Sequence, residues 1–164
     1  LHSLRTRGAA AYKGITLILL QQGALDWRSG QPYKDSVAFD ERIDIHHVFP
    51  VAWCKARDIE PKVYNSILNK TPLSASANRR IGGVAPSQYL TKIDREDWTH
   101  TDLGALLESH LIDVTHLRSD DFEAYRSARQ DALLVAIEAV MGKETVAEDE
   151  SEPVEDEEDV AELG

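Results

Sequence analysis

The last 21 residues of the chain, 144–164, hold eleven acidic side chains and no basic one. A segment with that charge and no periodic apolar face cannot bury enough surface to offset the entropy of ordering it, so we predict that it is disordered. The whole chain has 29 acidic and 18 basic residues, so residues 1–143 carry 18 of each. The net charge of −11 therefore belongs to the tail and does not exclude nucleic-acid binding by the rest of the chain.

The chain has a single cysteine, Cys54. One thiol can form neither an intramolecular disulfide nor a CxxC zinc site, which favours a reducing cytoplasm. The longest apolar run, residues 15–20, is far shorter than the roughly 20 residues that span a bilayer. The first residues also lack the layout of a signal peptide. We therefore expect a cytoplasmic protein with no membrane partner. Its start at Leu1 is compatible with excision from a longer protein.

Apolar spacing, capping residues and turn residues predict a mainly helical α+β domain over residues 1–143. We expect helices at 3–24, 51–57, 75–81, 86–93, 102–112 and 119–143, strands at 42–49 and 67–73, and a loop at 26–41. Ser74, Asp102 and Ser119 are the predicted starts of three of these helices. The expected buried face of the last helix is formed by Phe122, Tyr125, Leu133, Ile137 and Met141.

Two segments of the chain carry side chains suited to metal and acid–base chemistry. Residues 44–50 read DIHHVFP, and residues 65–80 read NSILNKTPLSASANRR. His46 and His47 end a predicted strand, while Asn69 and Asn78 straddle a strand-to-helix junction. A neutral imidazole and an Asn carbonyl oxygen can bind one divalent cation. An imidazole that does not bind the metal can take a proton from water. The pattern predicts a strand–strand–helix unit over about residues 42–82, with such ligands at both ends.

This unit resembles the HNH nuclease motif, also called the ββα-metal or His-Me finger motif. The wider match resembles the C-terminal nuclease part of GmrSD-type, modification-dependent restriction endonucleases. The sequence motifs that carry the resemblance are DWxxG, IDIHHVFPxxWC, NSILNKTPLSxxxNRxIGGxAPSxYL and a last helix ending in MGK. The resemblance extends from about Gly14 to Lys143. The resemblance implies a metal-dependent DNA endonuclease of a bacterial or archaeal phage-defence system.

Site roles follow from the same resemblance, position by position. His47 is implied as the general base, and Asn69 as the catalytic-motif residue whose side chain holds the loop that orients that base. His46 and Asn78 are the implied ligands of one divalent ion, with Mg²⁺ preferred and Mn²⁺, Ni²⁺ or Zn²⁺ compatible. Asp44 is expected to orient His46 by a hydrogen bond.

Local charge supports contact between this unit and DNA phosphates. Residues 46–95 contain eight basic and three acidic side chains, although residues 1–143 are neutral overall. Lys70, Arg79 and Arg80 are the candidate phosphate contacts. The resemblance further implies an N-terminal NTP-binding sensor domain in the same longer protein. A homodimer is a further possible partner arrangement, because cutting both strands needs two sites.

Other interpretations remain open from the sequence alone. The scaffold could be a non-catalytic module that binds DNA or protein, or the enzyme could be an RNase. Cys54 is more easily interpreted as a core residue than as a nucleophile, and Asn65 as a turn or cap residue. His110 and His116 are interpreted as surface or helix-end residues. The acidic tail could also lie over the basic site as a DNA mimic.

The adjacent histidines pose a geometric problem. Neighbouring side chains of a regular strand point to opposite faces. His46 and His47 can therefore reach one site only if the strand ends in an irregular turn before Pro50, and we predict that irregularity.

Overall fold

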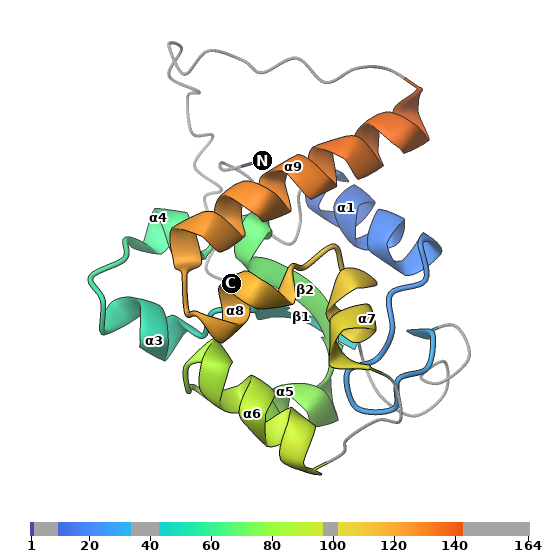
Figure 1. Ribbon diagram of the computed structural model, residues 1–164. Coiled ribbons are helices and arrows are strands. Elements are labelled where there is room, and N and C mark those ends of the chain that lie inside the picture. Colours follow the sequence, from blue (N-terminus) through green and yellow to red (C-terminus); the bar gives the residue numbers. More distant parts are fainter. Residues whose placement is uncertain (2–9, 34–42, 97–101, 143–164) are drawn as a thin grey trace, which may run out of the picture.

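A computed structural model describes Leu1 and residues 10–33, 43–96 and 102–142; the side chains of residues 11, 12, 43 and 44 are outside that description. The predicted disorder of the acidic tail falls on residues that the structure does not describe. The elements, labelled as in Figure 1, are α1 (Ala10–Gln21), β1 (Ile43–His47), α3 (Val51–Lys55), α4 (Pro61–Tyr64), the 3-10 helix η1 (Ile67–Asn69), β2 (Lys70–Ser74), α5 (Ala75–Ile81), α6 (Pro86–Glu96), α7 (Leu103–Glu108), α8 (Val114–Arg118) and α9 (Phe122–Met141).

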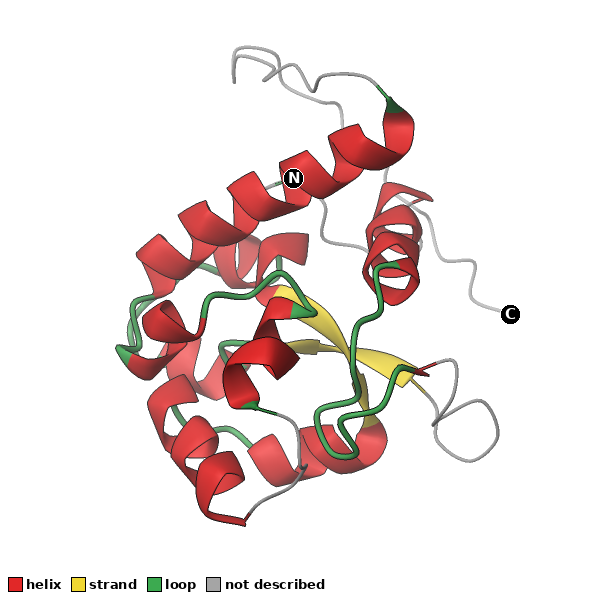
Figure 2. Ribbon diagram, turned by 45° about the vertical axis from the view of Figure 1, so that its right-hand side comes forward, coloured by secondary structure: helices red, strands yellow, loops and turns green. Residues whose placement is uncertain are grey.

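The predicted mainly helical α+β architecture is confirmed. One two-stranded antiparallel sheet, β1 and β2, lies at the centre, and helices surround it (Figures 1 and 2). In both views α5 and α6 lie on one side of the sheet and α9 on the other. The order of strand, strand and helix in β1, β2 and α5 is as predicted.

The pairing of β1 with β2 places the two histidines. Ile43 lies opposite Ser74, His46 opposite Thr71, and His47 opposite Lys70. The backbone N–H of Val48 still donates to the carbonyl of Asn69, at 2.9 Å, so the pairing continues just past the strand. This register sets which side chains share a face of the sheet.

Local capping chemistry explains where several helices begin. The Ser74 hydroxyl accepts from the N–H of Ala77, and the Asp102 carboxylate accepts from the N–H of Ala105, as expected for both caps. Gly82 ends α5 at a φ of 65°, where a side chain would be strained. The cap predicted at Ser119 is wrong, because Ser119 ends α8 and the Asp121 carboxylate caps α9 instead.

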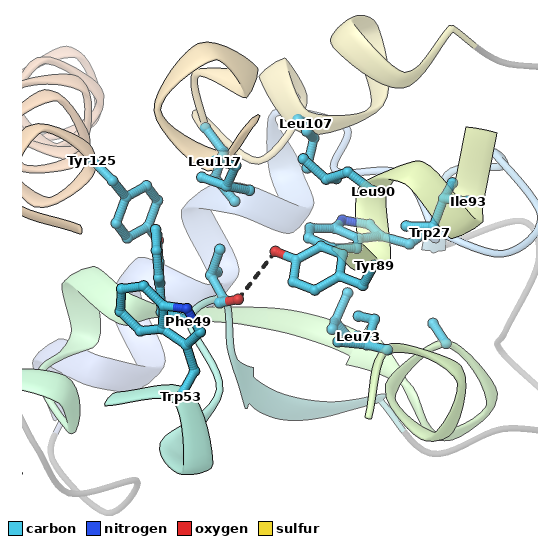
Figure 3. Close-up of a cluster of buried hydrophobic side chains, with 14 of the residues drawn as sticks. Trp27, Phe49, Trp53, Leu73, Tyr89, Leu90, Ile93, Leu107, Leu117 and Tyr125 are labelled. Carbon is cyan, nitrogen blue, oxygen red and sulfur yellow. Dashed lines mark hydrogen bonds between the residues drawn. The ribbon is translucent and has the colours of Figure 1, made fainter. Parts of the chain in front are cut away.

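The sheet lies between two buried apolar clusters. The larger one contains Leu73 of β2, Ala77 and Ile81 of α5, and Tyr89 of α6 (Figure 3). It also contains the buried Trp27 and Trp53. The smaller cluster is made by α1, η1 and α9, and Ile45 of β1 packs against it. Each face of the sheet is therefore covered by its own apolar cluster, and α9 contributes to both, with Phe122 and Tyr125 in the larger and Leu133 in the smaller.

The predicted buried face of α9 is partly wrong. Phe122, Tyr125 and Leu133 are buried, but Met141 is 63% exposed because α9 continues past the helices that cover it. The fully buried position between Tyr125 and Leu133 is taken by a charged residue, Arg129, which the apolar pattern did not indicate. In the part of the chain that the structure describes, no helix has the length and apolarity needed to cross a membrane.

Phe49 is the apolar anchor directly after the histidine pair. Its ring is fully buried and lies 4.9 Å from Trp53, 5.1 Å from Phe122 and 5.1 Å from Tyr125, measured between centroids. These contacts join the end of the sheet to α3 and α9.

We expect Phe49→Ala to lower the free energy of unfolding by about 3–5 kcal/mol, because it removes buried area and leaves a cavity. Val135→Ala, at a position that is 66% exposed on α9, is the control and should change it by less than about 0.5 kcal/mol. Urea unfolding followed by circular dichroism measures both. Equal effects of the two variants would contradict the anchoring role.

Candidate functional site

The strand ends in a bend before Pro50, as predicted, but the bend comes after both histidines. Both His46 and His47 are paired with β2, and the chain bends only at Val48 and Phe49. Side-chain alternation therefore directs the two imidazoles to opposite faces of the sheet. Because the pairing with Lys70 and Thr71 holds both histidines extended, the bend after them does not turn the two imidazoles to one face.

The side chain of Asn69 holds the bend that follows His47. Its amide oxygen accepts from the N–H of Phe49 at 2.8 Å, and its amide nitrogen donates to the carbonyls of Phe49 and Tyr64, each at 3.0 Å. The residue is fully buried. One carboxamide thus joins the loop after β1 to the end of α4.

His47 is half-buried and has a partner that the sequence did not reveal. Its Nε2 lies 3.0 Å from the amide oxygen of Asn65, and its ring lies edge-on to Tyr64 with 6.2 Å between centroids. An amide oxygen only accepts, so in this arrangement Nε2 carries the proton. The lone pair of His47 is then on Nδ1. Asn65 was interpreted as a turn or cap residue, and it does cap the C-terminus of α4.

No local signal could have found the contact of Asn65 with His47. The two residues are 18 positions apart, and α4, which places Asn65, was not predicted.

His46 shares a face of the sheet with the helix that carries Asn78. His46 lies opposite Thr71, and the next residue on that face of β2, Leu73, packs with Ala77 and Ile81 of α5. Asn78 follows Ala77 on α5 and is half-buried. An imidazole nitrogen and an amide oxygen are a neutral donor pair that suits a divalent cation completed by water and phosphate oxygens.

Other ligand sets are not evident in the described residues. Among them, no three His, Cys, Asp or Glu side chains are grouped as a metal site. The backbone of Asp44 pairs with Leu73, but its side chain is outside the description, so its predicted role toward His46 stays a prediction.

The three candidate phosphate contacts differ in exposure. Lys70 is only 9% exposed and lies opposite His47. Arg79 and Arg80 are exposed on the last turn of α5, and Arg80 is 3.5 Å from Glu96. The carbonyl of Arg80 also accepts from Lys92 at 3.3 Å. Arg79 and Arg80 are thus placed where a phosphate could approach from solvent, and Lys70 is placed in the sheet beside His47.

Cys54 is a core residue, in agreement with its expected role. It is fully buried, and its thiol lies 3.6 Å from the carbonyl of Phe49. Burial raises the pKa of the thiol to about 11, although the nearby charge of Arg57 lowers it somewhat. The thiolate needed for nucleophilic attack is therefore scarce at neutral pH.

His110 lies at the end of α7, one of the two positions expected for it, but it is fully buried and not on the surface. Its Nδ1 lies 2.7 Å from the Thr71 hydroxyl, and its Nε2 lies 2.8 Å from the carbonyl of Leu25. Burial lowers its pKa to about 4; the hydrogen bond to Leu25 opposes that shift, and the charge of Arg129 adds to it. The fold closes over this residue because the segment of Leu25 packs against the end of α7, far away in sequence. His116 is partly exposed, as expected.

No family model matches the chain, and no solved structure matches it. It is similar to the uncharacterized protein MJ0686 of Methanocaldococcus jannaschii, with 28% identity over 121 residues. The alignment covers 68% of this chain and 20% of that protein, so the chain spans about a fifth of the length of the relative it matches. Because that relative is itself uncharacterized, the function has to be argued from the site.

We expect Asn69→Ala to lower the free energy of unfolding by about 3 kcal/mol or more, because each buried backbone group left unpaired costs about 1–3 kcal/mol. Asn65→Ala is the matched control and removes one half-buried hydrogen bond, which is worth about 1 kcal/mol. Urea unfolding of both variants measures the difference. A loss at Asn69 no larger than that at Asn65 would contradict the loop-holding role.

We expect acid to destabilise the fold through His110. The unfolded imidazole binds a proton near its ordinary pKa of 6.5, but the folded one only near 4. Between these values the unfolded chain binds more protons, so stability falls as the pH falls, by about 3 kcal/mol in total.

The measurement is urea unfolding at pH 7, 5.5 and 4 for wild type and His110→Gln. The variant should lack this part of the pH dependence, whereas His116→Gln, at a partly exposed position, should keep it. An unchanged pH dependence in His110→Gln would show that another group is responsible.

Proposed function

We propose that this chain is a metal-dependent DNA endonuclease that hydrolyses phosphodiester bonds with His47 as its general base. The observation that supports this most is the Asn69 side chain, which ties both backbone groups of Phe49 and so holds the chain directly after His47. A general base must be held within reach of the proton it takes. Asn69 therefore supports the proposal through its place, since its hydrogen bonds hold the second residue after His47.

In the proposed reaction His47 accepts the proton of the attacking water. With its Nε2–H donated to Asn65, Nδ1 is the ring nitrogen proposed to take that proton. Asn65 would then also stabilise the imidazolium that forms, because the amide dipole points its oxygen at the ring. The general base contributes on the order of 10²–10⁴ in rate.

His46 and Asn78 are the residues proposed to hold a divalent ion. Such an ion, when bound, stabilises negative charge on the phosphate and on the leaving oxygen. His46 and His47 leave the backbone toward opposite faces of the sheet, so we place the scissile phosphate at the end of β1, within reach of both faces. Arg79 and Arg80 would contact neighbouring phosphates of the strand.

DNA in a phage-defence setting is proposed as the substrate class on the resemblance and on the local charge. The basic side chains of residues 46–95 and the exposed Arg79 and Arg80 favour a polyanionic partner. The phosphate chemistry does not itself select the sugar, so RNA is included in the test as the competing substrate. A sensor domain for NTP binding, and a second copy for cutting both strands, are proposed for the longer protein.

We expect the wild-type chain to nick supercoiled plasmid with Mg²⁺, Mn²⁺, Ni²⁺ or Zn²⁺ and to be inactive with EDTA. His47→Ala should lower the rate by about 10²–10⁴-fold, because it removes the base. His116→Ala, at a partly exposed histidine of α8, is the control and should keep full activity. Gel electrophoresis of the plasmid beside a structured RNA measures the rates.

Cleavage of the RNA alone would replace the proposed substrate. A folded wild type that binds DNA but cuts neither substrate with any of the four metals would instead support the non-catalytic binding module.

A further inference from the structure

Arg57 is an exposed cation whose position is set by the fold. It follows α3 directly, and its backbone N–H donates to the carbonyl of Cys54 at 3.1 Å, which holds the turn that ends the helix. Its guanidinium carbon lies over the Trp53 ring, 3.9 Å from the centroid. Guanidinium groups pack on aromatic faces in this way and keep their N–H donors available for an acceptor.

No carboxylate takes up those donors in the part of the chain that the structure describes. The ion pairs there join Glu60 to Lys62 at 2.8 Å and engage the arginines of α5, α8 and α9, but not Arg57. Its neighbour Asp58 is also exposed and is turned away from the helical path by a φ of 54°. Arg57 therefore presents an oriented guanidinium to solvent without a matching acid.

The ring beneath Arg57 ties it to the loop that follows His47. Trp53 lies 4.9 Å from Phe49 between ring centroids (Figure 3), and the backbone of Phe49 is held by the side chain of Asn69. Helix α3 begins at Val51, only four residues after His47. The same buried anchor thus fixes the segment after the proposed base and the platform on which Arg57 rests.

The exposed surface of α3 continues onto the turn after α5. A Cβ built on Gly83 would lie 3.5 Å from the Cβ of Ala52, so the turn between α5 and α6 contacts α3. Gly83 and Ala52 are both exposed, and so is Arg79, which lies on the last turn of α5. We call the surface formed by Arg79, Gly83, Ala52 and Arg57 the α3–α5 surface. It has a cation without a carboxylate partner at each end and small residues between them.

We propose that the α3–α5 surface is where the backbone of the DNA lies beside the site, with Arg57 as a second phosphate contact beyond Arg79. This inference rests on the proposed function and makes Arg57 a positioning residue. A planar guanidinium can donate two parallel N–H bonds to one phosphate, and small side chains let a backbone approach closely. Phosphate contacts set the register of a protein on nucleic acid and read no sequence.

The test measures DNA binding by the full chain in EDTA, where no cleavage occurs. Fluorescence anisotropy of a labelled duplex, repeated over a series of salt concentrations, gives the affinity and its salt dependence. Arg57→Ala should weaken binding about tenfold, the loss expected of one charge-assisted contact. It should also reduce the slope of log affinity against log salt by about 0.9. The loss should be the same on duplexes of unrelated sequence.

Lys55→Ala is the matched control, because it removes one exposed positive charge from the end of the same helix. Its affinity should stay within about twofold of wild type with an unchanged salt slope. Arg57→Lys keeps the charge but loses the planar donor fork, so it should weaken binding by about threefold. In plasmid nicking, Arg57→Ala should raise KM and leave kcat unchanged, because it removes binding that is equal in ground and transition states.

The outcomes separate this inference from the proposed function. Equal binding and salt slopes in Arg57→Ala and Lys55→Ala, with wild type binding and cutting DNA, would overturn the inference and leave the nuclease standing. A lower kcat with unchanged KM would overturn it as well, because Arg57 would then act on the reacting phosphate. Binding of polyglutamate that depends on Arg57, without binding of DNA, would assign the surface to an acidic protein. A wild type that neither binds nor cuts DNA would overturn the proposed function, and this inference with it.

Discussion

The buried carboxamide of Asn69 is the interaction on which the rest of the site depends. It satisfies both backbone groups of Phe49 and the carbonyl of Tyr64 at once, inside a region without water access. Two buried tyrosines bind the backbone of the same region. The Tyr89 hydroxyl donates to the carbonyl of Val48 (Figure 3), and the Tyr125 hydroxyl donates to the carbonyl of Leu68. A buried unpaired group costs more than one hydrogen bond gains, so the loss of any of these side chains is expected to destabilise the loops.

That constraint also explains why the chain bends where it does. The ladder of β1 and β2 runs unbroken through His47, and Asn69 then takes over the backbone groups of Phe49. The ring of Phe49 is thereby turned into the core. The bend follows the histidines instead of lying between them, so the two imidazoles start on opposite faces, and any ligand that uses both must lie at the end of the strand.

The features that sequence could predict are local. Ser74 and Asp102 begin their helices because a cap needs only the next three residues. The two short strands were indicated by their own residues, although their pairing joins segments separated by α3, α4 and η1. Asn65 and His110 could not be assigned, because each acquires its partner from 18 or more positions away. The hydrogen-bond partners of Asn65 and His110 are set by how distant segments of the chain pack together. Met141 shows the same limit of local sequence patterns. It lies at the helical spacing of the buried apolar residues of α9, but nothing in the described structure covers it.

Arg129 shows how packing also sets the charge of the core. Its guanidinium is 1% exposed, and within the described residues Nε, Nη1 and Nη2 have no hydrogen-bond partner. Burial lowers its pKa, and a charge so placed costs several kcal/mol, so stability is a poor reason for its presence. Its electrostatic effect reaches His110, where it acts with burial against protonation. A cation that keeps His110 neutral preserves the acceptor at Nδ1, and with it the direction of the hydrogen bond from Thr71.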